Sequence, residues 1–188
     1  IGNDLDTFWK NIKAEKVAFK PISKFDTSNY KVKLAAEVED FEPKEYMDAK
    51  TAKRMEPFSQ YAVVAAMQAL EDSKLNLDKE DRTRVGVSVG SGIGSLETLE
   101  REHTKILNKG PRRVSPLMVP MMISNMAPGQ ISMMHGLKGP SLTITTACAS
   151  GTHAIGEAFR MVQNGIVDMV ITGGSEAAIT PISVAGFS

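Results

Sequence analysis

One stretch of this sequence constrains the fold more than any other, because it predicts a strand, a helix and a second strand in succession. Residues 141–146 have strand character, residues 149–163 have the apolar spacing of a helix, and residues 167–172 form a continuous apolar strand. Earlier in the chain, a strand expected over 84–89 is followed by a helix expected over 95–108. Strands that alternate with helices form parallel sheets covered by helices. The sequence therefore predicts an α/β fold.

The only cysteine of the chain lies where the strand over 141–146 meets its helix. The start of a helix offers free backbone N–H groups and the positive end of the helix dipole, and both favour thiolate over thiol. The neighbours of Cys148 are small and leave space around the sulfur: Ala147, Ala149, Ser150 and Gly151. We interpret Cys148 as a nucleophile that is acylated and then passes the acyl group on. The alternative is a small buried hydrophobe, which is the commoner role of a lone cysteine.

The chain has three histidines, and none of them is convincing as the partner of this cysteine. His153 follows on the same expected helix but on another face, His103 lies among charged residues, and His135 lies in a glycine-rich turn. A cysteine nucleophile usually needs a histidine beside it. We therefore expect either that Cys148 is not catalytic or that its partners lie outside this chain.

Two glycine-rich segments follow expected strands. The segment GSGIG over residues 90–94 lacks the third glycine of a dinucleotide-binding fingerprint, because Ser95 stands in its place. We interpret it as a loop of close backbone approach, with Ile93 projecting into a pocket. The segment GGSEA over residues 173–177 is interpreted as a tight exit from a strand.

Apolar spacing also predicts which faces of the helices are covered. Further helices are expected over residues 4–15, 43–55 and 57–73, with irregular structure over 17–42 and short helices over 114–135. The helix over 95–108 is predicted to turn inward Leu96, Leu99, His103, Ile106 and Leu107. The helix after Cys148 is predicted to be a core helix that buries Ala154, Ile155, Ala158, Phe159 and Val162.

The composition excludes several classes of protein. Lys and Arg together number 22, and so do Asp and Glu, which argues against a general nucleic-acid binder. A single cysteine excludes an intrachain disulfide framework and a cysteine-clustered zinc site, and the reducing cytoplasm is the simplest location. No apolar run is long enough to span a membrane, and the sequence begins without a signal-peptide pattern.

Charge is distributed unevenly along the chain. Beyond residue 113 the only charged residues are Lys138, Glu157, Arg160, Asp168 and Glu176. That part is expected to be the interior of a larger fold or an interface. Its methionine-rich segment over 114–135 is interpreted as core, as a pliable apolar channel or as a subunit interface.

Two short basic groups lie in the other part of the chain. They consist of Lys50, Lys53 and Arg54, and of Arg112 and Arg113. The sequence leaves two interpretations open, a solvated face and a docking surface for an acidic partner.

These motifs together resemble those of the condensing enzymes of fatty acid synthesis, the type II 3-oxoacyl-[acyl-carrier-protein] synthases of the elongating type. The resemblance runs along essentially the whole chain and rests on FDTSNY (25–30), GSGIGSLETLEREH (90–103), GPRRVSP (110–116), NMAPGQIS (125–132), HGLKGPSLTITTACASGTHAIGEAFR (135–160) and GGSEAAITPISVAGF (173–187). It implies a thiolase-like fold, an α/β/α/β/α layered sandwich of two similar halves, in a homodimer. It also implies decarboxylative condensation of an acyl group on Cys148 with malonyl-loaded carrier protein, without a metal or an organic cofactor.

The resemblance also implies roles for individual residues. Cys148 matches the cysteine that accepts the acyl group from acyl carrier protein, and its backbone N–H would be one oxyanion donor. Ile93 matches the residue that closes the acyl pocket, and Met118 matches a pocket-lining residue contributed across the dimer. The residues that match basic positions meeting the acidic carrier protein are Lys50, Lys53, Arg54, Arg112 and Arg113.

The resemblance covers only part of a family member. It implies that residues 1–188 are an N-terminal part of the condensing-enzyme domain, without its first strand and without the C-terminal half that carries two catalytic histidines. We therefore expect this chain alone to be inactive in condensation. Two alternatives stay open: a thiolase or initiating synthase that uses coenzyme A, and a non-catalytic subunit of the same fold that pairs with an active partner.

Overall fold

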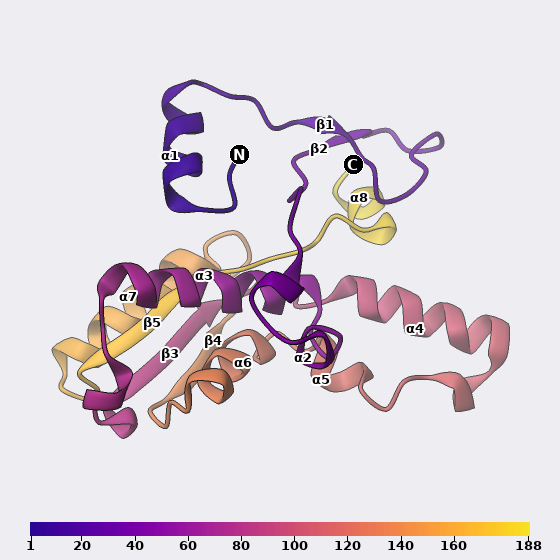
Figure 1. Cartoon of the computed structure of the whole chain (residues 1–188). Coiled ribbons are helices and arrows are strands. Elements are labelled where there is room, and N and C mark those ends of the chain that lie inside the picture. Colours follow the sequence, from indigo (N-terminus) through magenta and orange to yellow (C-terminus); the bar gives the residue numbers. More distant parts are fainter.

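A computed structural model describes all residues 1–188 of the chain, and its centre is a three-stranded parallel sheet (Figure 1). The strand order is β4 (Ser141–Ile144), β3 (Val85–Gly90) and β5 (Met169–Gly174). In register, Gly90 lies beside Ile144 on one side and Gly174 on the other. The carboxyl ends of the three strands therefore meet at one edge of the sheet, and the predicted α/β fold is confirmed.

Helices cover both faces of this sheet. The valines of β3, namely Val85, Val87 and Val89, belong to the apolar core that α3 (Pro57–Ser73) and α6 (Met126–His135) complete. The residues that alternate with them face α7 (Ser150–Gln163), where the Ser88 hydroxyl lies 3.4 Å from the carbonyl oxygen of Ala154. Every residue of β3 is buried because both of its faces are covered.

The other elements lie outside these three layers. They are α1 (Leu5–Lys13), β1 (Lys20–Pro21), β2 (Leu34–Ala35), α2 (Ala49–Ala52), α4 (Leu96–Lys109), α5 (Met118–Met122) and α8 (Pro181–Phe187), with 3-10 turns η1 (Pro43–Glu45), η2 (Leu77–Lys79), η3 (Arg82–Arg84) and η4 (Pro111–Arg113). Strands β1 and β2 pair antiparallel, and in Figure 1 they stand apart from the main sheet together with α1. None of the helices combines the length and the apolar character that a membrane crossing requires.

The prediction of a single helix over residues 43–55 is wrong. The structure forms η1 and then only the four-residue helix α2 (Ala49–Ala52). The Asp48 carboxylate accepts hydrogen bonds from the backbone N–H groups of Lys50 and Thr51, so the helix begins anew at Ala49. Pro57 holds the preceding Glu56 in an extended conformation, which separates α2 from α3.

The predicted inward face of α4 is also wrong, although the helix itself is confirmed between its cap Ser95 and Gly110. Of the five residues expected inside, Leu96 is half-buried and the other four are exposed, with Leu107 72% exposed. The buried side chains are those of Thr98 and Glu102. The reason is that α4 extends beyond the sheet (Figure 1), where no apolar layer covers it, and polar groups fix it instead.

The prediction for α7 is correct for one face only. Ala154, Ala158 and Met161 are buried against the sheet. Ile155, Phe159 and Val162 were expected to be buried and are exposed, Phe159 to 64%. The chain supplies one layer for this helix, the sheet, and the opposite face has no covering layer within residues 1–188.

Candidate active site

Cys148 lies in a tight turn between β4 and α7, at the edge where the three strands end. The cysteine is exposed, and α7 begins two residues later at Ser150. Ala147 has a φ of 51°, a left-handed conformation that is costly for a residue with a side chain. The Ser150 hydroxyl stabilises this turn, since it donates to the carbonyl oxygen of Ala147 at 2.6 Å and accepts from the backbone N–H of Thr146 at 2.9 Å. The thiol is therefore held just ahead of the N-terminus of α7.

A cavity of about 640 Å³ opens beside this thiol. Cys148 and Ile93 both line it, so the structure brings together two of the residues selected from the sequence. The remaining lining comes mainly from small residues at the strand ends, with Phe187 as its one aromatic side chain. Met118, the third candidate, is half-buried at the start of α5 and does not line this cavity.

Glycines let the strand ends approach the start of α7 at backbone distance. A Cβ atom on Gly90 would lie 2.3 Å from the carbonyl carbon and oxygen of Ser150. A Cβ atom on Gly174 would lie 2.9 Å from the Cα of Gly151. Real Cβ contacts of this length do not occur, so β3 and β5 can pack against α7 here only with glycine. The close-approach interpretation of the 90–94 loop is confirmed at Gly90.

Sequence reasoning missed the role of Glu176 in this site. Its carboxylate accepts a hydrogen bond from the backbone N–H of Gly92 at 2.7 Å and lies 3.4 Å from the Ser91 hydroxyl. The same carboxylate therefore holds the loop that carries Ile93 against the exit of β5. A signal was present, because Glu176 is a lone charge among small residues, but the segment was interpreted only as a strand exit.

No histidine lines the cavity beside Cys148. The Nδ1 atom of His153 lies 2.7 Å from the Thr146 hydroxyl, so this ring contacts the turn from the helix side. His103 is exposed on α4, and His135 ends α6, where burial lowers the pKa of its imidazole. No group of three or more histidine, cysteine, aspartate or glutamate side chains is arranged to hold a metal ion.

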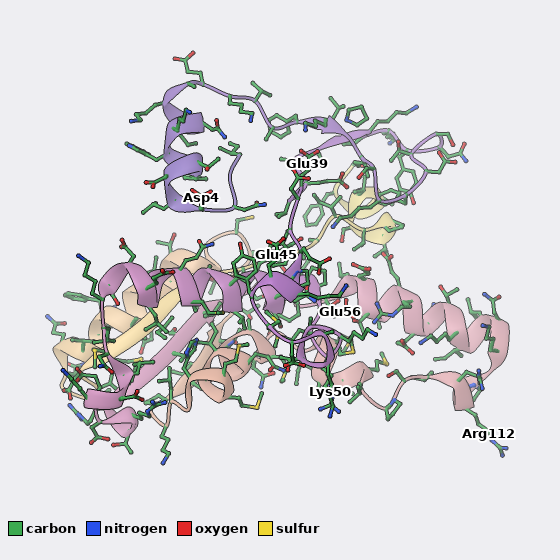
Figure 2. The ribbon with its side chains drawn as sticks, in the orientation of Figure 1. Asp4, Glu39, Glu45, Lys50, Glu56 and Arg112 are labelled. Carbon is green, nitrogen blue, oxygen red and sulfur yellow. The ribbon has the colours of Figure 1, made fainter.

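The five basic candidates lie away from the cavity, on α2 and the turn after it and on η4. All five are exposed, and none has a carboxylate within 4.0 Å. In Figure 2 the side chains of Lys50 and Arg112 both point toward the lower edge of the view. Arg112 and Arg113 also line a recess of about 260 Å³ together with Lys105 and Lys109. The charges of these five residues are therefore not paired with carboxylates of this chain.

Comparison with known proteins gives a consistent result. A family model described as "Beta-ketoacyl synthase, N-terminal domain" matches residues 1–188. The 3-oxoacyl-[acyl-carrier-protein] synthase 2 of Staphylococcus aureus is 48% identical over 188 residues, which is 100% of this chain and 47% of the relative. The protein of the same name from Synechocystis sp. is 46% identical over 188 residues and is covered to 45%. The chain thus spans about half the length of the curated relatives it matches.

Solved structures agree with these sequence matches. The ishigamide ketosynthase/chain length factor superposes with a TM-score of 0.92 at 26% identity, over 100% of this chain and 47% of that chain. A type II PKS acyl-carrier protein in complex with its ketosynthase bound to the hexaketide gives a TM-score of 0.75 at 29% identity, over 80% of this chain and 43% of that chain. The thiolase-like fold expected from the sequence is confirmed.

Proposed function

The chain belongs to the beta-ketoacyl synthase family, and we propose that it is the N-terminal part of a 3-oxoacyl-[acyl-carrier-protein] synthase that elongates fatty acids. The observation that carries this proposal is the exposed Cys148 in a cavity that it shares with Ile93, at the start of α7. The two named relatives favour a synthase that uses carrier protein over a thiolase that uses coenzyme A.

Cys148 is the nucleophile of the proposed reaction. Its thiolate attacks the carbonyl carbon of an acyl thioester on the carrier protein, the carrier thiolate leaves, and the acyl group stays on the sulfur. The malonyl-carrier protein then loses carbon dioxide, its carbanion forms a carbon–carbon bond to the acyl carbon, and the Cys148 thiolate leaves. The backbone N–H of Cys148 forms no hydrogen bond within the chain and is free to donate to the oxyanion of each tetrahedral intermediate.

The cavity beside Cys148 is the proposed start of the acyl pocket. Ile93 lines it and is 41% exposed, so its side chain has room to turn toward or away from the acyl chain. Met118 lies on a different element and would complete the pocket of the second protomer in a homodimer. Proton transfer in the condensation step needs histidines that this chain does not place in the cavity, and we assign them to the remainder of the protein.

The five basic residues form the proposed docking surface for the acyl- and malonyl-loaded carrier protein. Unpaired positive charge at the surface speeds the encounter with an acidic partner and orients it. The solved complex of an acyl-carrier protein with its ketosynthase supports this kind of partner. We place the enzyme in the cytoplasm, since its nucleophile must stay reduced.

The test is product formation by the full-length protein that carries this sequence. With acyl- and malonyl-carrier protein it should form 3-oxoacyl-carrier protein, and Cys148→Ala should remove this activity. Arg112→Glu should raise the KM for carrier protein, whereas Lys16→Glu, a control at an exposed lysine outside both basic groups, should not. Product formation by the folded Cys148→Ala variant would refute the proposal. The 188-residue chain alone should form no product, because no histidine lines its cavity.

A further inference from the structure

A network of two buried carboxylates and two partly exposed cations fixes α4 where apolar packing does not. Glu102 is 1% exposed and Glu56 is 4% exposed. Buried carboxylates are costly unless they are paired and hydrogen-bonded. Arg101 bridges the two, with its Nη2 atom 2.6 Å from Glu56 Oε1 and its Nε atom 3.4 Å from Glu102 Oε1. Glu102 also accepts from Lys105 Nζ at 2.7 Å and from the backbone N–H of Ser115 at 2.8 Å.

Each end of this network lies directly beside one of the two basic groups. Glu56 follows Arg54 by two residues, and Ser115 follows Arg113 by two residues. The two groups are far apart in the sequence, yet the path from Glu56 through Arg101 and Glu102 to Ser115 joins them. Figure 2 shows Lys50 and Arg112 on their separate elements, with Glu56 where α3 begins.

The network also places the positive charge of the recess beside η4. Lys105 lines this recess with Lys109, Arg112 and Arg113 and is held by its ion pair to Glu102. The hydrogen bond from Lys105, followed by that from the Ser115 N–H, holds the pKa of Glu102 below its ordinary range, so Glu102 is ionised at neutral pH. Without this carboxylate, Lys105 would lose its only carboxylate partner and the Ser115 N–H would lose its acceptor.

Stability alone is a weak reason for these charges, because well-packed apolar residues of similar volume often stabilise a protein as well as a buried ion pair does. What the carboxylate adds is a directed bond to the backbone of the loop that carries Arg112 and Arg113. We propose that Glu102 is a positioning residue that fixes the two basic groups relative to each other, so that the carrier protein meets a preformed surface. This inference rests on the proposed function and names the residue that organises its docking surface.

The test is Glu102→Gln in the full-length protein. Glutamine keeps the size of the side chain and can still accept one hydrogen bond, but it cannot pair with the two cations. We expect the KM for malonyl-carrier protein to rise about 3- to 10-fold while kcat changes less than about 2-fold. Acylation of Cys148 by a carrier-free acyl-coenzyme A should keep its rate. Glu71→Gln, at an exposed carboxylate on α3, is the matched control and should change neither value.

A double-mutant comparison shows whether Glu102 acts through the basic groups. Arg112→Ala should raise the KM for carrier protein in the wild type and raise it less in the Glu102→Gln background, because the arginine there is no longer held in place. The role of Glu102 would be overturned if the two substitutions changed the KM for carrier protein additively. It would also be overturned if Glu102→Gln slowed acylation by the carrier-free acyl-coenzyme A as much as acylation by carrier protein. If Glu102→Gln fails to fold, Glu56→Gln at the other end of the network should give the same pattern, and a normal KM there would overturn the inference. If Arg112→Ala itself leaves the KM unchanged, the docking surface of the proposed function fails as well.

Discussion

The corner around Cys148 and the outer helix α4 are fixed in place by different physical means. At the corner, the glycines of β3, β5 and α7 bring backbones into contact, and there is no room for a methyl group added at Gly90 or Gly174. Along α4, a network of two buried carboxylates and two partly exposed cations holds the helix and the loop that follows it. The stability that comes from close backbone packing does not change with pH, whereas the stability that comes from a network of ionised groups is lost when those groups lose their charges. The two regions should therefore respond differently to small substitutions and to acid.

The largest effect is expected from Gly90→Ala. The added Cβ would lie 2.3 Å from Ser150, so the start of α7 must move away from the sheet. We expect a loss of about 3 kcal/mol or more in the free energy of unfolding, measured by chemical denaturation. Gly173→Ala is the control: Gly173 lies on the neighbouring strand β5, beside Val89, and no atom lies within 4 Å of the added Cβ. This substitution should lower the free energy of unfolding much less. Equal losses would show that the corner does not depend on close approach.

Lowering the pH should change the stability contributed by the α4 network but not that contributed by the corner around Cys148. The pKa of Glu102 is lowered in the folded protein, so its stabilising effect is complete above its ordinary value of 4.5 and is lost as the pH falls through the lower folded value. The difference in unfolding temperature between wild type and Glu102→Gln should therefore be full at pH 7 and shrink below pH 4.5. The difference caused by Gly90→Ala should keep its size. A Glu102 effect that is the same at both pH values would contradict the ionic account of α4.

A smaller, local effect on loop dynamics is expected at Glu176, the carboxylate that hydrogen-bonds to the loop at the corner. Glu176→Ala removes the acceptor of the Gly92 N–H and frees the loop that carries Ile93. Hydrogen exchange of the Gly92 amide should become about 10-fold faster. Glu157→Ala, at a half-buried carboxylate of α7 whose ion-pair partner is Arg160, is the control and should leave this amide unchanged. Unchanged exchange in Glu176→Ala would mean that the loop is held by its glycines alone.

The smallest effect is expected at His153, although it is the histidine nearest to Cys148 in the sequence. Its ring contacts Thr146 and does not line the cavity. In the full-length protein, His153→Ala should therefore leave kcat for condensation within about 2-fold of wild type. A loss of kcat beyond about 10-fold would make His153 a catalytic partner and would remove the need for histidines outside this chain.

The sequence predicted the main sheet well, because apolar runs indicate buried strands and glycines indicate where those strands end. The three strands of the main sheet, α3, α4 and α7 all lie within two residues of where periodicity placed them, and Cys148 shares a cavity with Ile93. The short strands β1 and β2 lie in the segment that was expected to be irregular. Which faces are covered was not predictable, since Ile155 and Phe159 are apolar whether or not a layer lies over them. For Glu176 the sequence showed a lone charge but not its partner, because the Gly92 N–H that it accepts from lies in a distant part of the chain. For Glu102 the sequence did not show the burial of the side chain, which puts its carboxylate within reach of the Ser115 N–H.

The most direct measurement of the central claim is the mass of the folded full-length protein after incubation with a long-chain acyl-carrier protein. The account predicts that one acyl group is added, that peptide mapping places it on the Cys148 sulfur, and that prior alkylation of Cys148 prevents it. An acyl group found on any other residue, or no added mass on a folded protein with its thiol free, would contradict the account.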